Sequence, residues 1–204
     1  MNVQEFGKLL ARKRAEIDRL VRRQLPVRVG DIAKAHYQNN FRLGGFVNDG
    51  FEKWPEVRRR LSGRKGAGAR YGPLLSGRNH LFSSVKYTPS DYRVKVANDL
   101  LYAPVHNWGG ETHPTVTPRM RKFAWAMYYK TAGIRKRKPG ATRRGRKKKK
   151  VIPEEAKTWR NLALTRKRKL NVKVPKRQFL GESRELNGEI NNKIESEIRN
   201  LIYK

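Results

Sequence analysis

A segment with a two-residue hydrophobic period restricts what this chain can fold into more than any other feature. Between Asp91 and Asn98, the apolar residues Tyr92, Val94 and Val96 occupy every second position. Side chains alternate between the two faces of a β-strand, so this pattern predicts a strand with one buried face. We expect Tyr92 on that buried face.

A β-hairpin is predicted around this strand. Residues 85–87 are expected to form its partner, and residues 88–91 (Thr-Pro-Ser-Asp) are typical of a type I turn, because proline presets the backbone angle at the second turn position. Upstream, the apolar spacing over 74–82 indicates a short helix. Downstream, residues 100–110 carry large apolar side chains and end on two glycines, so we expect the chain to pack there and then turn sharply.

Further helices are predicted where apolar residues recur at three- and four-residue spacing. They cover 3–24 (ended by Pro26), 28–41 (ended by Gly44), 118–130 (with Thr117 as N-cap), a short segment opened by Pro153, and the segment from Ser183 onward. A third strand is expected over 170–174, with Pro175 at its end. The first helix is basic and amphipathic, which suits either a packed helix with a solvated face or one that binds nucleic acid or a membrane.

Two groups of aromatic residues each allow two interpretations. Phe46, Phe51 and Trp54 belong either to a packed loop over the sheet or to an exposed docking surface. Trp125 and Tyr129 project from the side of their helix opposite its apolar stripe, so either another layer or another subunit is expected to cover them.

The net charge of +32 indicates a negatively charged partner. It results from 49 Lys and Arg against 17 Asp and Glu, and it opposes compaction while favouring contact with a polyanion. No cysteine is present, so the fold needs no oxidising compartment. We find neither a signal peptide nor an apolar run of the ~20 residues that span a bilayer, so we expect a cytoplasmic protein without a membrane partner.

A basic segment over 135–150 concentrates this charge. It is predicted to be a disordered or extended insertion, because a run with eleven cations among sixteen residues and no acid cannot bury apolar area. Removing its eleven cations lowers the net charge from +32 to +21. The segment is either a solvated loop or a nucleic-acid arm that binds by counterion release. The candidate nucleic-acid-binding residues are Arg135, Lys136, Arg137, Lys138, Arg143, Arg144, Arg146, Lys147, Lys148, Lys149 and Lys150.

The sequence predicts no enzyme and no cofactor. It contains no nucleophile elbow, dinucleotide fingerprint or kinase motif. His106 and His113, with Glu111 between them, fit no standard zinc spacing, and the glycines at 109–110 oppose a rigid site. We therefore predict no metal site.

Several segments in a fixed order resemble one protein family. The order L-L-S-G-x-x-x-L-x-x-S-V, a turn, V-x-V and then Y-A-x-x-H-N-x-G-G is similar to the virion morphogenesis or tail completion proteins of long-tailed bacteriophages. Residues 41–54 (FRLGGFVNDGFEKW) and 174–181 (VPKRQFLG) match two further parts of that family. The resemblance covers roughly residues 27–200 without the basic insertion, which departs from the family. The matched positions are Leu75, Gly77, Leu81, Ser84, Tyr102, Ala103, His106, Gly109, Pro175, Arg177, Phe179, Leu180 and Gly181.

The resemblance implies a structural virion protein of α+β fold, with a twisted antiparallel sheet flanked by helices. Such a protein assembles as a ring at the head–tail junction, next to connector and tail proteins. We expect one domain over 1–204, with its core in 26–134 and 151–204, an N-terminal helix over 1–25 and the insertion over 135–150.

Subunit contacts are predicted at the aromatic and matched positions. Tyr102 and Trp108 are expected as buried anchors, Arg177 as a fork to a carboxylate or carbonyl, and Phe179 as a plug. The predicted interface residues are Tyr102, His106, Trp108, Trp125, Tyr129, Arg177 and Phe179. The alternative function is a basic, non-enzymatic nucleic-acid-binding protein, which explains the charge without the motif order.

Overall fold

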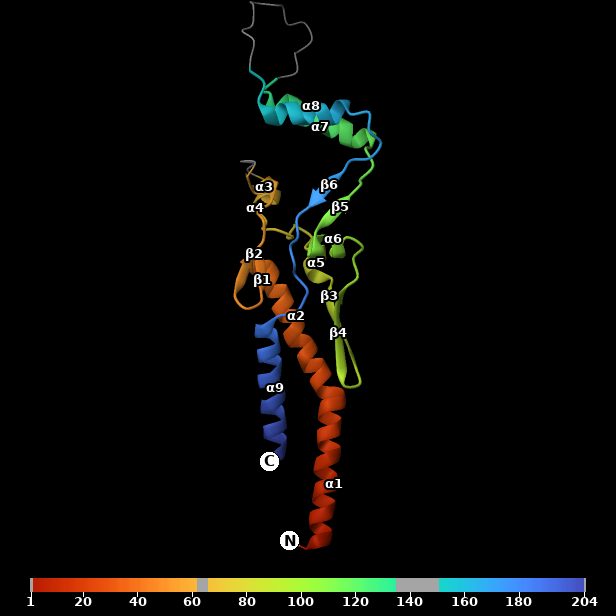
Figure 1. Ribbon diagram of the computed structural model, residues 1–204, viewed down its shortest axis with the longest axis vertical. Helices are drawn as coiled ribbons and strands as arrows, with labels where there is room; N and C mark the ends of the chain where they lie inside the picture. Colours follow the sequence, from red (N-terminus) through yellow and green to blue (C-terminus); the bar gives the residue numbers. More distant parts are fainter. Residues whose placement is uncertain (1, 62–65, 135–150, 204) are drawn as a thin grey trace, which may run out of the picture. The chain divides into compact units, whose positions relative to one another are not determined.

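The chain forms two compact units in a computed structural model that describes residues 2–61, 66–134 and 151–203 (Figure 1). Unit 1 comprises Met1–Gly110 and Val174–Lys204, and unit 2 comprises Glu111–Lys173. Helices combine with small antiparallel sheets, which confirms the predicted α+β class. The strands pair two by two, β1 with β2, β3 with β4 and β5 with β6, in place of one larger sheet. One domain over 1–204 stays a prediction.

Unit 1 contains most of the secondary structure. Its helices are α1 (Val3–Arg19), the π-helical η1 (Leu20–Gln24), α2 (Leu25–Leu43), α3 (Arg58–Leu61), α4 (Ala67–Arg70), α5 (His80–Ser83), α6 (Ala103–Trp108) and α9 (Arg184–Ile202). Its strands are β1 (Gly45–Val47), β2 (Phe51–Lys53), β3 (Val85–Ser90) and β4 (Arg93–Asn98). The predicted helix over 74–82 is shorter than expected, because Leu74 has a positive φ of 61° and only α5 is helical.

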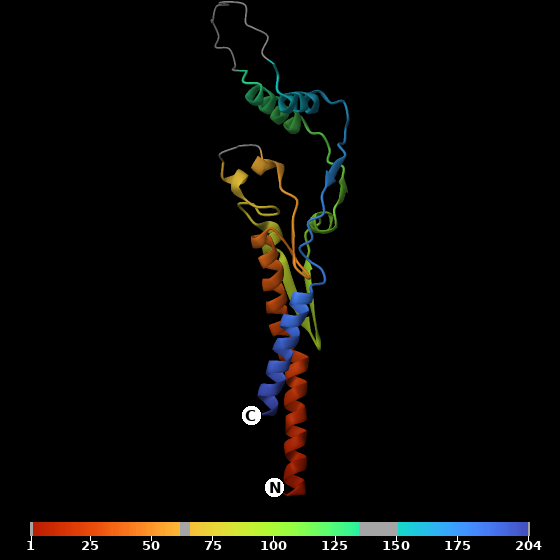
Figure 2. The same ribbon diagram turned by 60° about the vertical axis from the view of Figure 1, so that its left-hand side comes forward.

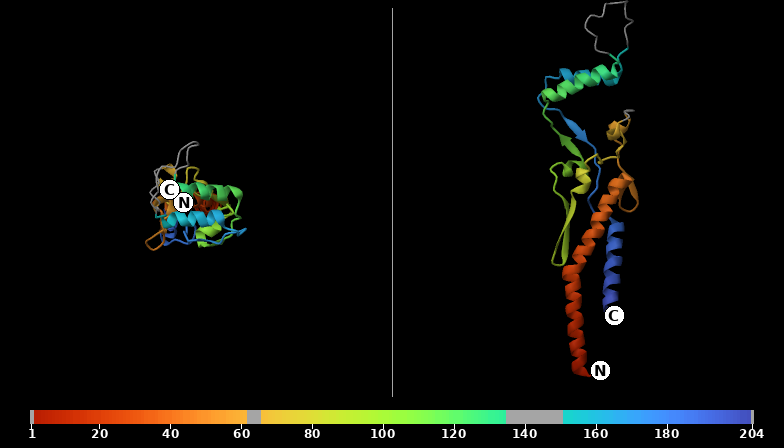
Figure 3. Two further views of the ribbon diagram at one scale, coloured as in Figure 1. Left: turned by 90° about the horizontal axis from the view of Figure 1, so that it is seen from above. Right: turned by 180° about the vertical axis from the view of Figure 1, so that it is seen from behind.

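The first two predicted helices form one continuous helical rod, so the prediction that Pro26 separates them is wrong. α1, η1 and α2 follow one another without a break, and Pro26 lies in the first turn of α2. Proline has no N–H to donate to the Arg22 carbonyl four residues earlier. The backbone N–H of Tyr92 donates to that carbonyl instead, at 3.3 Å. The rod bends at this π-helical turn (Figure 3).

The β3–β4 hairpin is present, but its turn lies further along the chain than predicted. Pro89 pairs with Val94 and Ser90 with Arg93, so Asp91 and Tyr92 form the loop. Tyr92 therefore leaves the strand, adopts a φ of 60° and is exposed.

Contacts with the helical rod explain the position of this turn. The Tyr92 hydroxyl donates to Asp18 at 2.6 Å, and Arg22 and Arg23 hold Asp91 at 2.7 and 3.1 Å. The loop is thus defined by its docking site on the rod, which local turn chemistry does not reveal. Figure 2 shows the hairpin beside the rod.

A second hairpin docks on the start of α9. Gly44 ends α2 in the left-handed conformation, as its position predicts. The loop between β1 and β2 then places the N–H groups of Asp49 and Gly50 at 3.1 and 3.0 Å from the Glu185 carboxylate. Ser183 caps α9 by accepting from the Leu186 N–H. α9 packs along α2 and α1.

The core of unit 1 is aromatic. Phe41, Trp54 and Phe179 are buried together, with Leu81 and Val85 beside them. The Phe41 ring lies 5.6 Å from Trp54 and 5.1 Å from Phe179, centroid to centroid. Phe46 is also buried, which supports the packed-loop interpretation of 46–54, although Phe51 remains exposed.

Unit 2 is built on a helix pair. Its elements are α7 (Pro118–Thr131), α8 (Glu154–Leu164), β5 (Gly110–Thr112) and β6 (Val172–Val174), the two strands sharing one end residue each with unit 1. Thr117 caps α7 as predicted, by accepting from the Met120 N–H. α7 packs against α8 and buries mainly small side chains.

Candidate functional site

Three segments that are far apart in the sequence meet in unit 1. They are 41–54, 102–110 and 174–181, and we call their meeting point the motif junction. Asn107 is its central residue: its Oδ1 accepts from the N–H groups of Phe179 and Leu180 at 2.8 and 2.9 Å, and its Nδ2 donates to the Leu180 carbonyl at 3.0 Å. Asn107 is buried, and its amide supplies the hydrogen bonds that buried backbone groups need.

The third segment joins through Trp54. Its indole Nε1 donates to the Gln178 carbonyl at 2.8 Å, while the Tyr37 hydroxyl donates to the Gly181 carbonyl at 2.7 Å. Residues 174–181 thus cross the core without a helix or a long strand to satisfy their backbone. Side chains from three other parts of the chain, Asn107, Trp54 and Tyr37, supply the missing hydrogen bonds.

Gly109 permits the close approach of two of these segments. It has a φ of 76°, and a Cβ at this position would lie 2.9 Å from the Lys176 nitrogen. Any other residue at position 109 would therefore force the 102–110 and 174–181 segments apart. The Arg177 N–H donates to the His106 carbonyl at 2.9 Å, directly beside this contact.

Arg177 is the buried cation of the junction. It is 7% exposed, and its Nε donates to the Pro55 carbonyl at 2.9 Å. Its Nη2 also donates to the Glu56 carbonyl at 3.5 Å, so the guanidinium binds two backbone carbonyls of its own chain. The subunit contact expected of Arg177 stays a prediction. Burial and the neighbouring Arg59 guanidinium lower the pKa of Arg177, while Glu56 opposes this shift.

A cavity of about 240 Å³ lies beside these arginines. Arg59, Arg177, His80 and His106 contribute to its lining, together with leucine side chains. Burial, and then the charge of Arg177, lower the pKa of His106, so the ring favours its neutral form. Its Nδ1 is buried and has no hydrogen-bond partner among the described residues.

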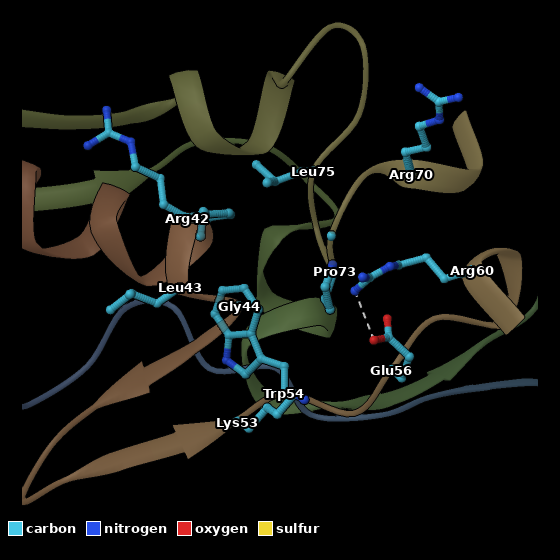
Figure 4. Close-up of a pocket in the computed structure, with 12 residues that line it drawn as sticks. Arg42, Leu43, Gly44, Lys53, Trp54, Glu56, Arg60, Arg70, Pro73 and Leu75 are labelled. Carbon is cyan, nitrogen blue, oxygen red and sulfur yellow. Dashed lines mark hydrogen bonds and ion pairs between the residues drawn. The ribbon is translucent and has the colours of Figure 1, made fainter. Parts of the chain in front are cut away.

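A second cavity of about 250 Å³ carries a larger excess of positive charge (Figure 4). Arg42, Lys53, Arg60 and Arg70 line it around the Trp54 ring. Glu56 lines it too, and its carboxylate binds Arg60 at 2.9 Å. Arg42 and Arg70 point away from that ion pair, and the Arg42 guanidinium lies over the Phe82 ring, 5.5 Å from its centroid.

The predicted interface residues fall into three groups, which are exposed, partly buried and buried. Trp108 is 63% exposed, and Tyr102 and Tyr129 are also exposed, so the first two are not buried within the chain as expected of anchors. Trp125 is partly buried and stacks on Tyr129 at 5.9 Å. Arg177 and Phe179 are buried inside unit 1, where their own chain covers them, so they offer no surface to a neighbouring copy. His106 is partly buried.

The predicted nucleic-acid-binding residues, from Arg135 to Lys150, lie outside the described residues. His113 Nδ1 lies 3.0 Å from the Asn171 side-chain oxygen within unit 2. No group of three His, Cys, Asp or Glu side chains in the described part of the chain is arranged to hold a metal ion.

Sequence reasoning missed Asn107 and the closeness of the two cations Arg59 and Arg177. The only signal for Asn107 was its place in the Y-A-x-x-H-N-x-G-G segment. Comparison of the chain with family models, curated proteins and solved structures found no match. None of the helices within 2–61, 66–134 and 151–203 has the length and apolarity that crossing a bilayer requires.

Proposed function

We propose that this chain is a structural virion protein, a tail completion or neck component that forms a ring at the head–tail junction of a phage. The observation that carries the proposal is the motif junction. The segments that resemble the family's motifs join through hydrogen bonds from the Asn107 and Trp54 side chains to the main chain of residues 178–180, and they build a core. Residues used in this way fit a rigid building block that has no catalytic task.

Exposed aromatic side chains support the assembly part of the proposal. Trp108 and Tyr102 lie at the surface of unit 1, and Tyr129 at the surface of unit 2. Large apolar side chains at a surface favour contact with another protein. The ring would bind neighbouring connector and tail proteins, and its cations would contact genomic DNA without sequence preference.

The test is assembly. The purified protein, alone and with the head and tail particles of the phage that encodes it, is examined by light scattering and electron microscopy. We expect a closed oligomer, or one that closes when the particles are added. A protein that stays monomeric under both conditions, or that turns over a substrate, would overturn the proposal.

The second candidate function is nucleic-acid binding without a ring. The four cations around the Trp54 cavity favour it, because one carboxylate balances only part of their charge. Anisotropy of labelled duplex DNA is measured across salt concentrations, where each lost phosphate contact lowers the slope of log affinity against log salt by about 0.9.

The matched variants for this test each remove three cations. One carries Arg42→Gln, Lys53→Gln and Arg70→Gln, and the control carries Arg78→Gln, Lys86→Gln and Lys95→Gln on an exposed surface elsewhere in unit 1. A monomer whose salt slope falls only in the first variant would favour this second function. A ring with weak DNA affinity would favour the first.

A further inference from the structure

The cavity beside Arg59 and Arg177 has cations in its lining but no Asp or Glu among the described residues that form it. We call it the Arg177 cavity. All the side chains that line it belong to unit 1. Ser76 and His80 are exposed and belong to the lining, so the cavity opens to solvent. A ligand can therefore enter it from outside.

Arg177 keeps part of its hydrogen-bonding capacity in this cavity. Its Nε and Nη2 donate to the Pro55 and Glu56 carbonyls, whereas its Nη1 has no hydrogen-bond partner among the described residues. The side chain is buried, so little water replaces that partner. A guanidinium presents its N–H groups in a planar fork that fits the two oxygens of a carboxylate or phosphate. Arg177 is therefore suited to bind an oxyanion.

The positive charge at the cavity is only partly balanced. Burial and then the charge of Arg59 lower the pKa of Arg177, and the charge of Glu56 raises it. The Glu56 carboxylate, however, already accepts from the Val57 N–H at 3.0 Å and pairs with Arg60 at 2.9 Å. An anion in the cavity would offset the repulsion between Arg59 and Arg177, in a place where water screens it poorly.

The apolar part of the lining selects the kind of anion. Four aliphatic side chains contribute to it, namely Val57, Leu74, Leu75 and Leu81. Phosphate would lose water against these side chains and gain nothing in return. A carboxylate on a short apolar chain places methylene groups there instead, and their burial is favourable. Drug-sized ligands need about 300–1,000 Å³, so a cavity of about 240 Å³ suits a single side chain.

We infer that the Arg177 cavity binds a carboxylate carried on a short apolar chain, as in an acidic side chain of a partner protein. The carboxylate binds the Arg177 guanidinium, and the apolar chain packs against the leucines. The inference does not rest on the proposed ring, because such a ligand can bind to a single copy of the chain.

Nuclear magnetic resonance of the full chain tests the class of ligand. Acetate, propionate, butyrate and inorganic phosphate are each titrated at constant ionic strength. The Arg177 Nε–Hε signal and the Leu74 methyl signals should shift and saturate, while the methyl signals of Leu164, an exposed residue of unit 2, should not. Each added methylene should tighten binding by about fourfold, and phosphate should bind more weakly than propionate. Equal affinities along the series, or equal shifts at Leu74 and Leu164, would overturn the inference.

A carboxylate supplied by the chain itself should block the cavity. His80→Glu places one at an exposed position of the lining, and the matched control Thr88→Glu places one at an exposed position of β3. Propionate should bind on the order of tenfold more weakly to the first variant and with little change to the second. Neither change touches a buried side chain, and circular dichroism verifies that both variants fold. Two variants with the same affinity for propionate would contradict the site.

A peptide distinguishes the two sources of the carboxylate. A short peptide with one glutamate between two leucines is compared with its glutamine counterpart through the same signals. If the glutamate peptide binds more tightly than propionate and the glutamine peptide does not bind, the ligand is an acidic side chain of a partner. If propionate binds but neither peptide does, the cavity takes small carboxylates, and a partner protein as their source is wrong.

Discussion

The two units of this chain bury different kinds of side chain. Unit 1 buries large aromatic residues, with Phe41 and Phe179 fully covered and Trp54 nearly so. In unit 2, α7 and α8 bury Ala124, Met127, Ala132, Ala156 and Ala163. Phe123 touches Trp159 edge to face at 5.7 Å, yet it is 51% exposed.

This difference indicates that the two units depend to different degrees on contacts outside themselves for their stability. In unit 1, side chains such as Asn107 and Trp54 also satisfy the backbone of distant segments, so its core both excludes water and fixes the chain path. In unit 2, small residues allow two helices to approach closely, while Phe123 and Tyr129 remain exposed. Unit 1 should therefore hold its fold alone, and unit 2 should gain more from a partner.

Removing one core ring should produce the largest effect. Phe179→Ala empties a fully buried position and should lower the free energy of unfolding by about 3–5 kcal/mol, measured by urea unfolding. Phe123→Ala, the control in unit 2, should cost less than about 1 kcal/mol because its ring is half exposed. Equal losses from both substitutions would remove the distinction between the units.

Removing the central amide of the motif junction should have the next largest effect. Asn107→Ala leaves the N–H groups of Phe179 and Leu180 without a partner, at about 2–4 kcal/mol in total. Hydrogen exchange should show faster exchange at these two amides. Asn191→Ala, on an exposed position of α9, should stay within about 0.5 kcal/mol. Unchanged exchange at 179 and 180 would contradict the role of Asn107.

Filling the helix contact of unit 2 tests the other side of the comparison. Ala156 is a fully buried position of α8. Ala156→Leu places a larger side chain there and should lower the free energy of unfolding by about 1–3 kcal/mol through overpacking. Circular dichroism melting measures the loss. Ala126→Leu, on the exposed side of α7, should be nearly neutral. If Ala156→Leu stabilises the protein, the α7–α8 contact has free space, and the close approach argued above is wrong.

Local signals in the sequence predicted much of the fold. Thr117 and Ser183 cap α7 and α9, and Gly44 ends α2, because each of these positions depends on residues within one helical turn. The β3–β4 turn could not be placed in this way. Asp91 and Tyr92 form it because they dock on the helical rod, a contact between segments far apart in the sequence.

The candidate site was predicted in part. The motif order pointed to residues 102–110 and 174–181, and Arg177 does bind a backbone carbonyl. Burial was assigned less well: Phe179 is a core residue, whereas Trp108 is exposed, although both are large and apolar. Which large side chain faces inward depends on how Asn107 holds the 174–181 segment, and no periodic pattern encodes that.

Two histidines make unit 1 the pH-sensitive unit, through an effect smaller than those of the substitutions above. Burial lowers the pKa of both His36 and His106. At His106 the charge of Arg177 lowers the pKa further, whereas at His36 the charges of Glu189 and Glu185 oppose the shift. Above the ordinary histidine pKa of about 6.5, both rings are neutral in the folded and unfolded chain, so stability should not change with pH. Below it, the unfolded chain binds protons before the folded chain does, so stability falls until the lowered pKa values are passed.

The melting temperature should accordingly fall between pH 7.5 and pH 5, in a window set by the ordinary histidine pKa near 6.5. His36→Gln with His106→Gln should flatten this dependence, while His80→Gln with His113→Gln, both at exposed positions, should leave it unchanged. The buried Nε2 of His36 and Nδ1 of His106 find no partner among the described residues, so a proton there gains no hydrogen bond that would offset its burial. Amide protection factors, which correct for the slower intrinsic exchange at lower pH, should fall in unit 1 before unit 2 as the pH falls. The opposite order would mean that the alanine-rich helix pair, and not the aromatic core, controls the response to acid.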